Sequence, residues 1–321
     1  EHGDLEALRR HLSTPPVEPH ATPGVSILKP LCGVDDQLTE NLASFAALAW
    51  PDLEVVLGVR SARDAAYPLA RAAARRWPGR FRVVLQRGAP GQNPKVNQLV
   101  TLAREARHDL LVVSDSNVRV APGYLAEIAA HLERPEVGLV THLVAGVGER
   151  RLGSLFENLH LAGAIAPGVA GAKRLAGPDL VIGKSMALRR RDLEALGGFE
   201  SVRDVLAEDY VIGARVSRDL GKRVALASTP VENVSQDRRV AGFAARYLRW
   251  AVMQRRIAGT FAYAAMALLN PALLALGACL AHPDRRVLGA AAAVAAAKAI
   301  LDGASARLLR PGGFAAWQLA L

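Results

Sequence analysis

Aromatic residues and cysteines are scarce in this chain of 321 residues. Phe, Trp and Tyr make up 5% of the chain. Its formal charge of +10 comes mostly from arginines, and these are scattered along the sequence. Modules that bind nucleic acid usually combine a basic stripe with stacking aromatic side chains or a recognisable motif. The absence of that combination argues against nucleic acid as a partner, although a basic chain can still bind anionic lipid or phosphorylated small molecules.

The two cysteines, Cys32 and Cys279, are far apart and outside any metal-ligand spacing. The sequence therefore shows neither a disulfide framework nor a zinc site, and a reducing compartment is the default expectation. Hydrophobic residues make up 51% of the chain and charged residues 22%. This composition is apolar for a soluble protein but too charged for a protein buried wholly in lipid. We therefore expect a soluble domain joined to membrane segments.

The region 257–321 supplies the candidate membrane segments. Residues 257–281 run for 25 residues without a charge, which is long enough to cross a bilayer core of ~30 Å. Asn270 and Pro271 interrupt this run, so its helix is expected to be kinked or re-entrant if it enters the membrane. A shorter apolar run follows, and a third begins at Phe314. A helix pair buried in a soluble core is the alternative, because Ala-rich runs are only weakly hydrophobic.

Between residues 24 and 256, aliphatic runs alternate with helical patterns. Strands are predicted at 25–31, 54–59, 81–86, 110–114 and 137–144, and helices up to residue 49 and at 64–77, 96–107 and 122–133. This alternation predicts an α/β domain with a mainly parallel central sheet covered on both faces, whose ligand lies beyond the carboxyl ends of the strands. The preceding residues 1–23 are polar and Pro-rich without a signal peptide, and are expected to be a linker at a truncated N-terminus.

Asp115 directly follows the predicted strand 110–114. A carboxylate at the end of a buried strand costs free energy unless it is paired or holds a cation, and a hard divalent cation is a natural partner. The alternative is a cap for the helix that begins near Pro122. Asp115 lies too far upstream for that role.

Three other places carry candidate binding or catalytic side chains. Asp64 follows the strand 54–59, and Glu208 and Asp209 open a helical pattern. The third place is one helix face that suits a diphosphate and a ring, or alternatively anionic lipid headgroups; its residues are Arg246, Arg249 and Trp250.

Taken in order, these motifs resemble the ceramide glucosyltransferase family. They are VSILKPLCGVD (25–35), NPKVNQL (93–99), DLLVVSDSNVRV (109–120), VGLVTHLV (137–144), VIGKSMALRR (181–190), LGGFE (196–200), LAEDYVIG (206–213) and RYLRW (246–250). The family comprises lipid-directed inverting glycosyltransferases, similar to glycosyltransferase family 2. The resemblance implies a GT-A type nucleotide-sugar-binding domain over residues 24–256, followed by membrane helices.

The resemblance also implies a role for each candidate residue. On the donor side, Asp64 would hold the uracil of a UDP-sugar, Asp115 would ligate Mg²⁺ or Mn²⁺, and Lys95 and Asn97 would approach the phosphates. On the reaction side, Asp209 would be the general base with Glu208 supporting it, and Arg249, Trp250 and Arg246 would steady the leaving UDP.

This sequence departs from the family pattern at three of these places. Around Asp64, RSARDAAYP has a single Asp where many members carry several acidic residues and a proline. The metal motif is Asp-Ser-Asn, so Asp115 would be the motif's lone carboxylate ligand. Arg246 stands where processive polysaccharide synthases usually have Gln, which favours a single transfer over polymerisation. Lys184, in VIGKSM, either lines the acceptor entrance or is solvated.

The function implied is transfer of a sugar, with glucose as the first expectation, from a UDP-sugar to the primary hydroxyl of ceramide or a similar lipid. The enzymatic alternative is a UDP-N-acetylglucosamine or other UDP-sugar transferase acting on a hopanoid or other bacterial lipid. The non-enzymatic alternative is a membrane-anchored nucleotide-sugar-binding protein. Arginines crowd the start of the first apolar run, which by the positive-inside rule predicts a cytoplasmic catalytic domain. The Ala- and Arg-rich composition favours a bacterial inner membrane.

Overall fold

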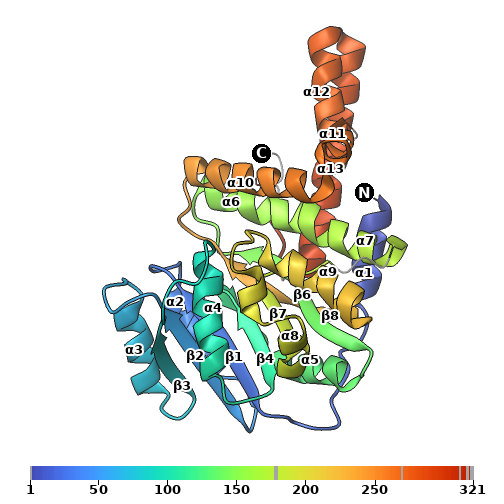
Figure 1. The fold of residues 1–321 in the computed structure, drawn as a ribbon. Coiled ribbons are helices and arrows are strands. Elements are labelled where there is room, and N and C mark those ends of the chain that lie inside the picture. Colours follow the sequence, from blue (N-terminus) through green and yellow to red (C-terminus); the bar gives the residue numbers. More distant parts are fainter. Residues whose placement is uncertain (1, 177–179, 269, 311, 316–317, 319–321) are drawn as a thin grey trace.

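The computed structural model describes residues 2–176, 180–268, 270–310, 312–315 and 318. Among them, an eight-stranded sheet forms the centre, in the order β3-β2-β1-β4-β7-β6-β8-β5 (Figure 1). The strands are β1 (Val25–Leu31), β2 (Leu53–Val59), β3 (Phe81–Leu85), β4 (Leu110–Ser114), β5 (Val118–Arg119), β6 (Val137–Val147), β7 (Ser185–Arg189) and β8 (Arg223–Val234). All but β5 and β7 run in one direction. The predicted mainly parallel sheet is therefore confirmed.

Helices cover both faces of this sheet, which explains why its central strands are aliphatic throughout. Every residue of β1, β2 and β4 is buried. One face packs against α2 (Leu38–Ala46), α3 (Tyr67–Arg76) and α5 (Tyr124–Glu133). The other packs against α4 (Pro94–Glu105), α8 (Arg190–Ala195), the 3₁₀ helix η2 (Phe199–Val202) and α9 (Glu208–Leu220). The carboxyl ends of the strands thus form an edge between two layers of helices.

A third apolar cluster joins both ends of the chain to this body. It lies between β6, α1 (His2–Leu12), α6 (Leu152–His160), the π-helix η1 (Leu161–Ile165), α7 (Ala166–Ala176) and the end of α13 (Arg285–Leu309). The expectation of a linker before residue 24 is therefore corrected, because Ala7 and Leu8 on one side of α1 are buried here with Ala306 and Leu309. The amphipathic spacing within HGDLEALRRHL, short as it is, was enough to form a packed helix.

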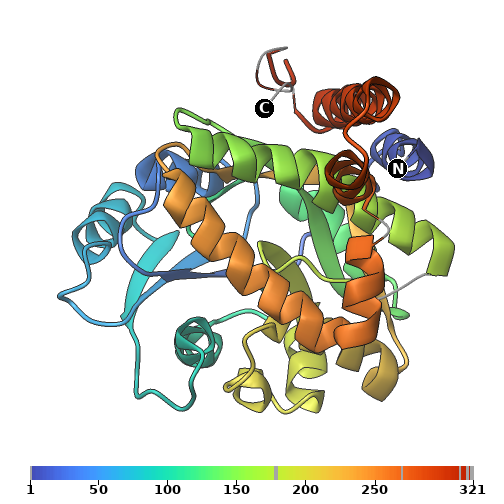
Figure 2. The same ribbon diagram turned by 90° about the horizontal axis from the view of Figure 1, so that it is seen from above.

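The remaining C-terminal helices leave the body. α10 (Val240–Ala258) lies across its top, and α12 (Pro271–Ala281) and α13 project from it as a hairpin (Figures 1 and 2). Within the described residues, α13 is long and apolar enough to cross a membrane, with a mean hydropathy of 1.6 over a window that is 6% buried. A second span exists only if Thr260–Met266 of α11 (Thr260–Leu268) and α12, bent by 73°, count as one.

The bend in the first apolar run has a local cause. Asn270 caps α12, with its side-chain oxygen accepting hydrogen bonds from the backbone N–H of Ala272 at 3.0 Å and Leu273 at 3.3 Å. Pro271 then occupies the first turn, where it has no N–H to leave unsatisfied. The expected kink is confirmed. The expected third run from Phe314 lies largely outside the described residues.

Candidate active site

Strand register brings four polar side chains together at the carboxyl edge of the sheet. Ser114 of β4 pairs with Ser185 of the antiparallel strand β7. The residue after Ser114 therefore faces the residue before Ser185, and the Asp115 N–H donates to the Lys184 carbonyl at 3.3 Å. Asp115 stands at the end of a strand, as the sequence predicted.

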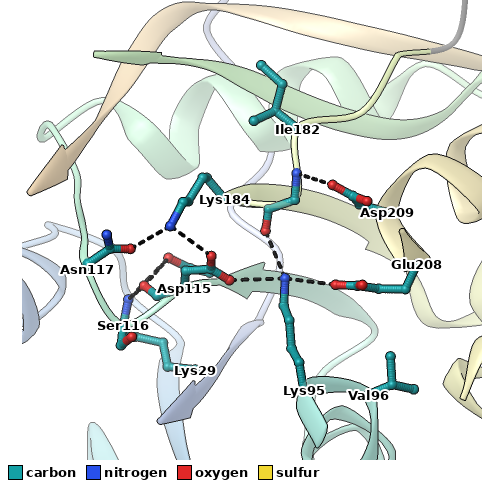
Figure 3. A network of polar contacts seen from close by, with 12 residues as sticks. Lys29, Lys95, Val96, Asp115, Ser116, Asn117, Ile182, Lys184, Glu208 and Asp209 are labelled. Atoms are coloured by element: carbon teal, nitrogen blue, oxygen red, sulfur yellow. Dashed lines mark hydrogen bonds and ion pairs between the residues drawn. The ribbon is translucent and has the colours of Figure 1, made fainter. Parts of the chain in front are cut away.

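The carboxylate of Asp115 lies between two ammonium groups (Figure 3). Its Oδ1 is 3.0 Å from Lys95 Nζ and its Oδ2 is 3.1 Å from Lys184 Nζ. Burial by itself raises the pKa of Asp115, but the charges and hydrogen bonds of these lysines hold the pKa well below its usual range. Asp115 is thus an anion at every physiological pH.

Lys95 links this carboxylate to a second one. Lys95 lies in the first turn of α4, which Asn93 caps by accepting from the N–H groups of Lys95 and Val96. Its Nζ is 2.9 Å from Glu208 Oε1 and donates to the Gly183 carbonyl at 3.2 Å. Burial lowers the pKa of Lys95, yet the surrounding carboxylates raise it above its ordinary value. Lys95 therefore stays charged and orients both acids.

Asp209 lies next to Glu208 at the start of α9 but has different partners. Its carboxylate accepts hydrogen bonds from the N–H of Gly183 at 2.7 Å and of Tyr210 at 2.8 Å. Burial and the charge of Glu208 raise the pKa of Asp209, against the opposing effect of Lys95. A buried carboxylate with a raised pKa is suited to taking up a proton.

Lys29 is a further member of the site, and the sequence motifs did not predict it. It is fully buried in β1, with Nζ donating to Ser114 Oγ at 3.1 Å and to the Asp115 carbonyl at 2.7 Å. The ammonium also lies 3.9 Å from the centroid of the Phe45 ring. Burial lowers its pKa to about 7, partly offset by Asp115. The sequence does contain a signal for Lys29, because a lysine inside the buried strand VSILKPL is as unusual as the aspartate after LLVVS.

The R-x-x-R-W segment lies on α10, above this edge. Arg246 is 3.5 Å from the buried carboxylate of Glu157 on α6 and stacks over the Trp250 ring at 5.1 Å. Trp250 in turn packs against His160, with ring centroids 6.0 Å apart. Arg249 is exposed. The structure thus joins Arg246 and Trp250 in one contact and leaves Arg249 on the outer surface of the helix.

Two candidate residues lie outside the cluster. Asp64 follows β2 as predicted, and its Oδ1 accepts from the N–H groups of Gly33 and Ala66, each at 2.9 Å. Asn97 does not join the site. Its side chain donates to the Gly91 carbonyl at 2.8 Å and accepts from the Gly91 N–H at 2.9 Å. This amide shapes the loop before α4, and the approach of Asn97 to the phosphates stays a prediction.

A model of glycosyl transferase family 21 matches residues 5–321. The chain belongs to this family. It is 30% identical over 242 residues to ceramide glucosyltransferase 1 of Caenorhabditis elegans, covering 73% of the chain and 50% of that relative. It is 32% identical over 126 residues to the ceramide glucosyltransferase of Komagataella phaffii, covering 38% and 25% respectively. The chain spans about half the length of the Caenorhabditis elegans relatives it matches. The resemblance found in the motifs is thereby confirmed.

Solved structures agree on the fold of the family 21 chain. The mannosyltransferase PcManGT from Pyrobaculum calidifontis, in complex with GDP-Man and Mn²⁺, is similar with a TM-score of 0.53 and 21% identity, over 96% of the chain and 81% of that structure. GalNAc-T7 with UDP, GalNAc and Mn²⁺ is similar with a TM-score of 0.50 and 13% identity, over 67% and 43%. These likenesses show a GT-A type fold.

Proposed function

We propose that this family 21 chain is the catalytic part of a membrane-bound inverting glycosyltransferase. It would transfer glucose from UDP-glucose to the primary hydroxyl of ceramide or a similar lipid. One observation carries the proposal: Asp115, whose pKa is lowered, and Asp209, whose pKa is raised, lie at the same sheet edge on either side of Lys95 and Gly183. Lys95 pairs with Asp115 and donates to the Gly183 carbonyl, and the Gly183 N–H donates to Asp209. Such a difference between two neighbouring acids assigns one to cation binding and the other to proton transfer.

The oxygens around Lys184 support a divalent cation as cofactor. Asp115 Oδ2 and Asn117 Oδ1 lie 3.1 Å and 2.8 Å from Lys184 Nζ, so two hard oxygen donors already converge on one cation. Mg²⁺ prefers such ligands and binds through one or two carboxylates plus substrate phosphates. Among the described residues, no group of three or more His, Cys, Asp and Glu could hold a metal. Asp115 and Asn117 would therefore hold Mg²⁺ or Mn²⁺ together with the donor diphosphate, where the ion would neutralise charge on the leaving UDP.

Asp209 would act on the acceptor side. Its carboxylate takes the proton of the lipid hydroxyl as the hydroxyl oxygen bonds to the anomeric carbon. The bond from that carbon to the β-phosphate oxygen breaks, and its electron pair leaves with UDP. Because the leaving group is a diphosphate stabilised by positive charge, the site needs no acid to protonate it.

Lys95 and the α10 segment would complete the donor side. Lys95, in the first turn of α4, is charged and stands beside Asp115, where a diphosphate would also meet the helix N-terminus. Arg246 and Trp250 would close over the leaving UDP with Arg249, and Asp64 would hold the uracil from the end of β2. Arginine suits this role because its planar guanidinium binds phosphate through paired hydrogen bonds.

The lipid acceptor implies a membrane, and the apolar hairpin supports one. On this hairpin, Leu274, Leu280 and Ile300 expose between 54% and 78% of their surface. We infer that α12 and α13 insert into a bacterial inner membrane, with the catalytic body in the cytoplasm. Proteolysis of sealed inverted and right-side-out vesicles tests the orientation. Digestion of the body only in inverted vesicles is expected, and digestion only from the outer face would contradict it.

The activity itself is tested by incubating the purified full-length protein with a panel of UDP-sugars and lipid acceptors, with products identified by mass spectrometry. Glucosylceramide formation is expected. A product carrying N-acetylglucosamine on a hopanoid would instead select the enzymatic alternative. Nucleotide-sugar binding without any product, under conditions where the protein is folded, would favour a binding protein.

A further inference from the structure

The buried cluster at the sheet edge is balanced in formal charge. In direct ion pairs, Lys95 and Lys184 face the two carboxylates of Asp115 and Glu208. Lys29 donates to the Asp115 carbonyl, and Asp209 lies beside Glu208. A divalent cation entering alone would add two positive charges to a cluster whose ion-paired side chains are only 7% to 26% exposed. The cluster therefore disfavours the ion until negative charge enters with it or a lysine leaves.

The three lysines are not equally easy to displace. Lys29 is bonded to Ser114 Oγ and a backbone carbonyl under the Phe45 ring. Lys95 has the Gly183 carbonyl and Glu208 as partners in addition to Asp115. The Lys184 ammonium contacts Asp115 Oδ2 and donates to Asn117 Oδ1. These are the oxygens that the proposed function assigns to the metal.

We propose that the ammonium of Lys184 occupies the metal position in the free enzyme. The metal ion displaces it when the nucleotide-sugar binds. This inference rests on the proposed function. In the free enzyme, the ammonium keeps Asp115 and Asn117 oriented and prevents a divalent cation from binding without nucleotide. When the donor diphosphate brings its negative charge, the cation replaces the ammonium, and Lys184 turns to the phosphate oxygens.

The position of Lys184 means that its ammonium would move only a short distance in this exchange. It is the residue before β7, opposite Asp115 in the antiparallel register, and its side chain is 15% exposed. A long, flexible side chain with a fixed backbone can move its ammonium between two groups of oxygens without disturbing the sheet. The exchange makes metal and donor binding mutually dependent, since each reduces the charge imbalance that the other creates.

The test is Mn²⁺ binding to the detergent-solubilised full-length protein, with free Mn²⁺ measured by electron paramagnetic resonance, with and without UDP. We expect the wild type to bind Mn²⁺ weakly alone and at least tenfold more tightly with UDP. Lys184→Met should bind Mn²⁺ alone at least tenfold more tightly than the wild type and bind UDP about tenfold more weakly when Mn²⁺ is saturating. Lys184→Arg should restore the wild-type dependence on UDP.

Lys222→Met is the matched control, since Lys222 pairs with Asp192 before β8, at the opposite edge of the sheet. It should leave Mn²⁺ binding unchanged. Two results together would overturn the role of Lys184 and leave the proposed metal site intact. They are an equal Mn²⁺ affinity of the wild type and Lys184→Met without UDP, and a loss of UDP-dependent Mn²⁺ binding in Asp115→Asn. Absence of Mn²⁺ binding by the wild type even with UDP would overturn both.

Discussion

The two sides of the site use the same residue type in opposite electrostatic settings. On the donor side, two ammonium groups flank Asp115 and hold its pKa low. On the proposed acceptor side, Asp209 has backbone N–H donors and Glu208 beside it, and its pKa is raised. Both are partly buried carboxylates at strand or helix ends, so residue type and burial alone do not assign their roles. We infer the different roles of Asp115 and Asp209 from the charges of their neighbours.

The largest effect is expected from Asp115→Asn. Removing the carboxylate removes the proposed cation and leaves Lys95 and Lys184 without their shared partner. Because metal-based charge stabilisation contributes several kcal/mol, we expect kcat to fall by about 10³-fold or more. Turnover measured as UDP release checks this, with EDTA-treated wild type losing activity in parallel.

Asp192→Asn controls for lost stability in that variant. Asp192 is also a buried carboxylate held by two cations, Arg189 and Lys222, away from the site. Breaking such a buried pair costs about 3–5 kcal/mol of unfolding free energy. We expect both variants to melt at lower temperature, and only Asp115→Asn to lose kcat while folded. Retained turnover in Asp115→Asn would remove this residue from the metal role.

Asp209→Asn should lower kcat by less, about 10²-fold, at the lower end of the range typical of a removed general base. The amide keeps the size of the side chain and one acceptor oxygen for the Gly183 N–H, so the fold should persist. Turnover at several pH values checks the assignment. In the wild type, kcat should decline as pH falls through the raised pKa of Asp209, because the protonated acid cannot accept a proton. That acidic limb should vanish in Asp209→Asn, and its persistence would assign the base elsewhere.

Arg249→Ala tests whether an exposed residue joins the site during turnover. Hydrogen bonds to charged groups contribute about 1.5–3 kcal/mol, which corresponds to a loss of roughly 10- to 100-fold in kcat/KM. The exposed Arg255, further along α10, provides the matched control as Arg255→Ala. Equal activity of the two variants would mean that Arg249 serves the surface of the helix and not the nucleotide.

Glu208→Gln should have the smallest effect on kcat, below about tenfold, since Glu208 orients Lys95 and touches no reacting atom. Its charge raises the pKa of Asp209. Removing that charge should therefore shift the acidic limb of kcat to lower pH. If Glu208→Gln lost more activity than Asp209→Asn, the base would be Glu208.

The sequence allowed prediction of the sheet and of the carboxylates because both depend on local patterns. Aliphatic runs bounded by helices predicted the strands, and a charge directly after LLVVS predicted a residue at the ligand-binding edge. The family resemblance, carried by ordered motifs, favours Asp209 over Glu208 as the base, and this choice stays a prediction.

The lysines were harder to predict because their meeting depends on strand pairing. Lys29, Lys95 and Lys184 come from β1, α4 and the residue before β7, and their convergence on Asp115 follows from a register that spans more than 150 residues of sequence. The antiparallel insertion of β7 between β4 and β6 is not readable from hydrophobic periodicity. For the same reason, the sequence did not show that α1 packs against the end of α13.

The most direct test of the division between donor and acceptor sides is UDP binding by isothermal titration calorimetry, in the presence of Mn²⁺, to the wild type, Asp115→Asn and Asp209→Asn. We expect Asp209→Asn to bind UDP within about threefold of the wild type and Asp115→Asn to bind it at least tenfold more weakly, because of these two carboxylates only Asp115 would hold the ion that binds the nucleotide. Wild-type affinity in Asp115→Asn, or an equal loss in both variants, would contradict it.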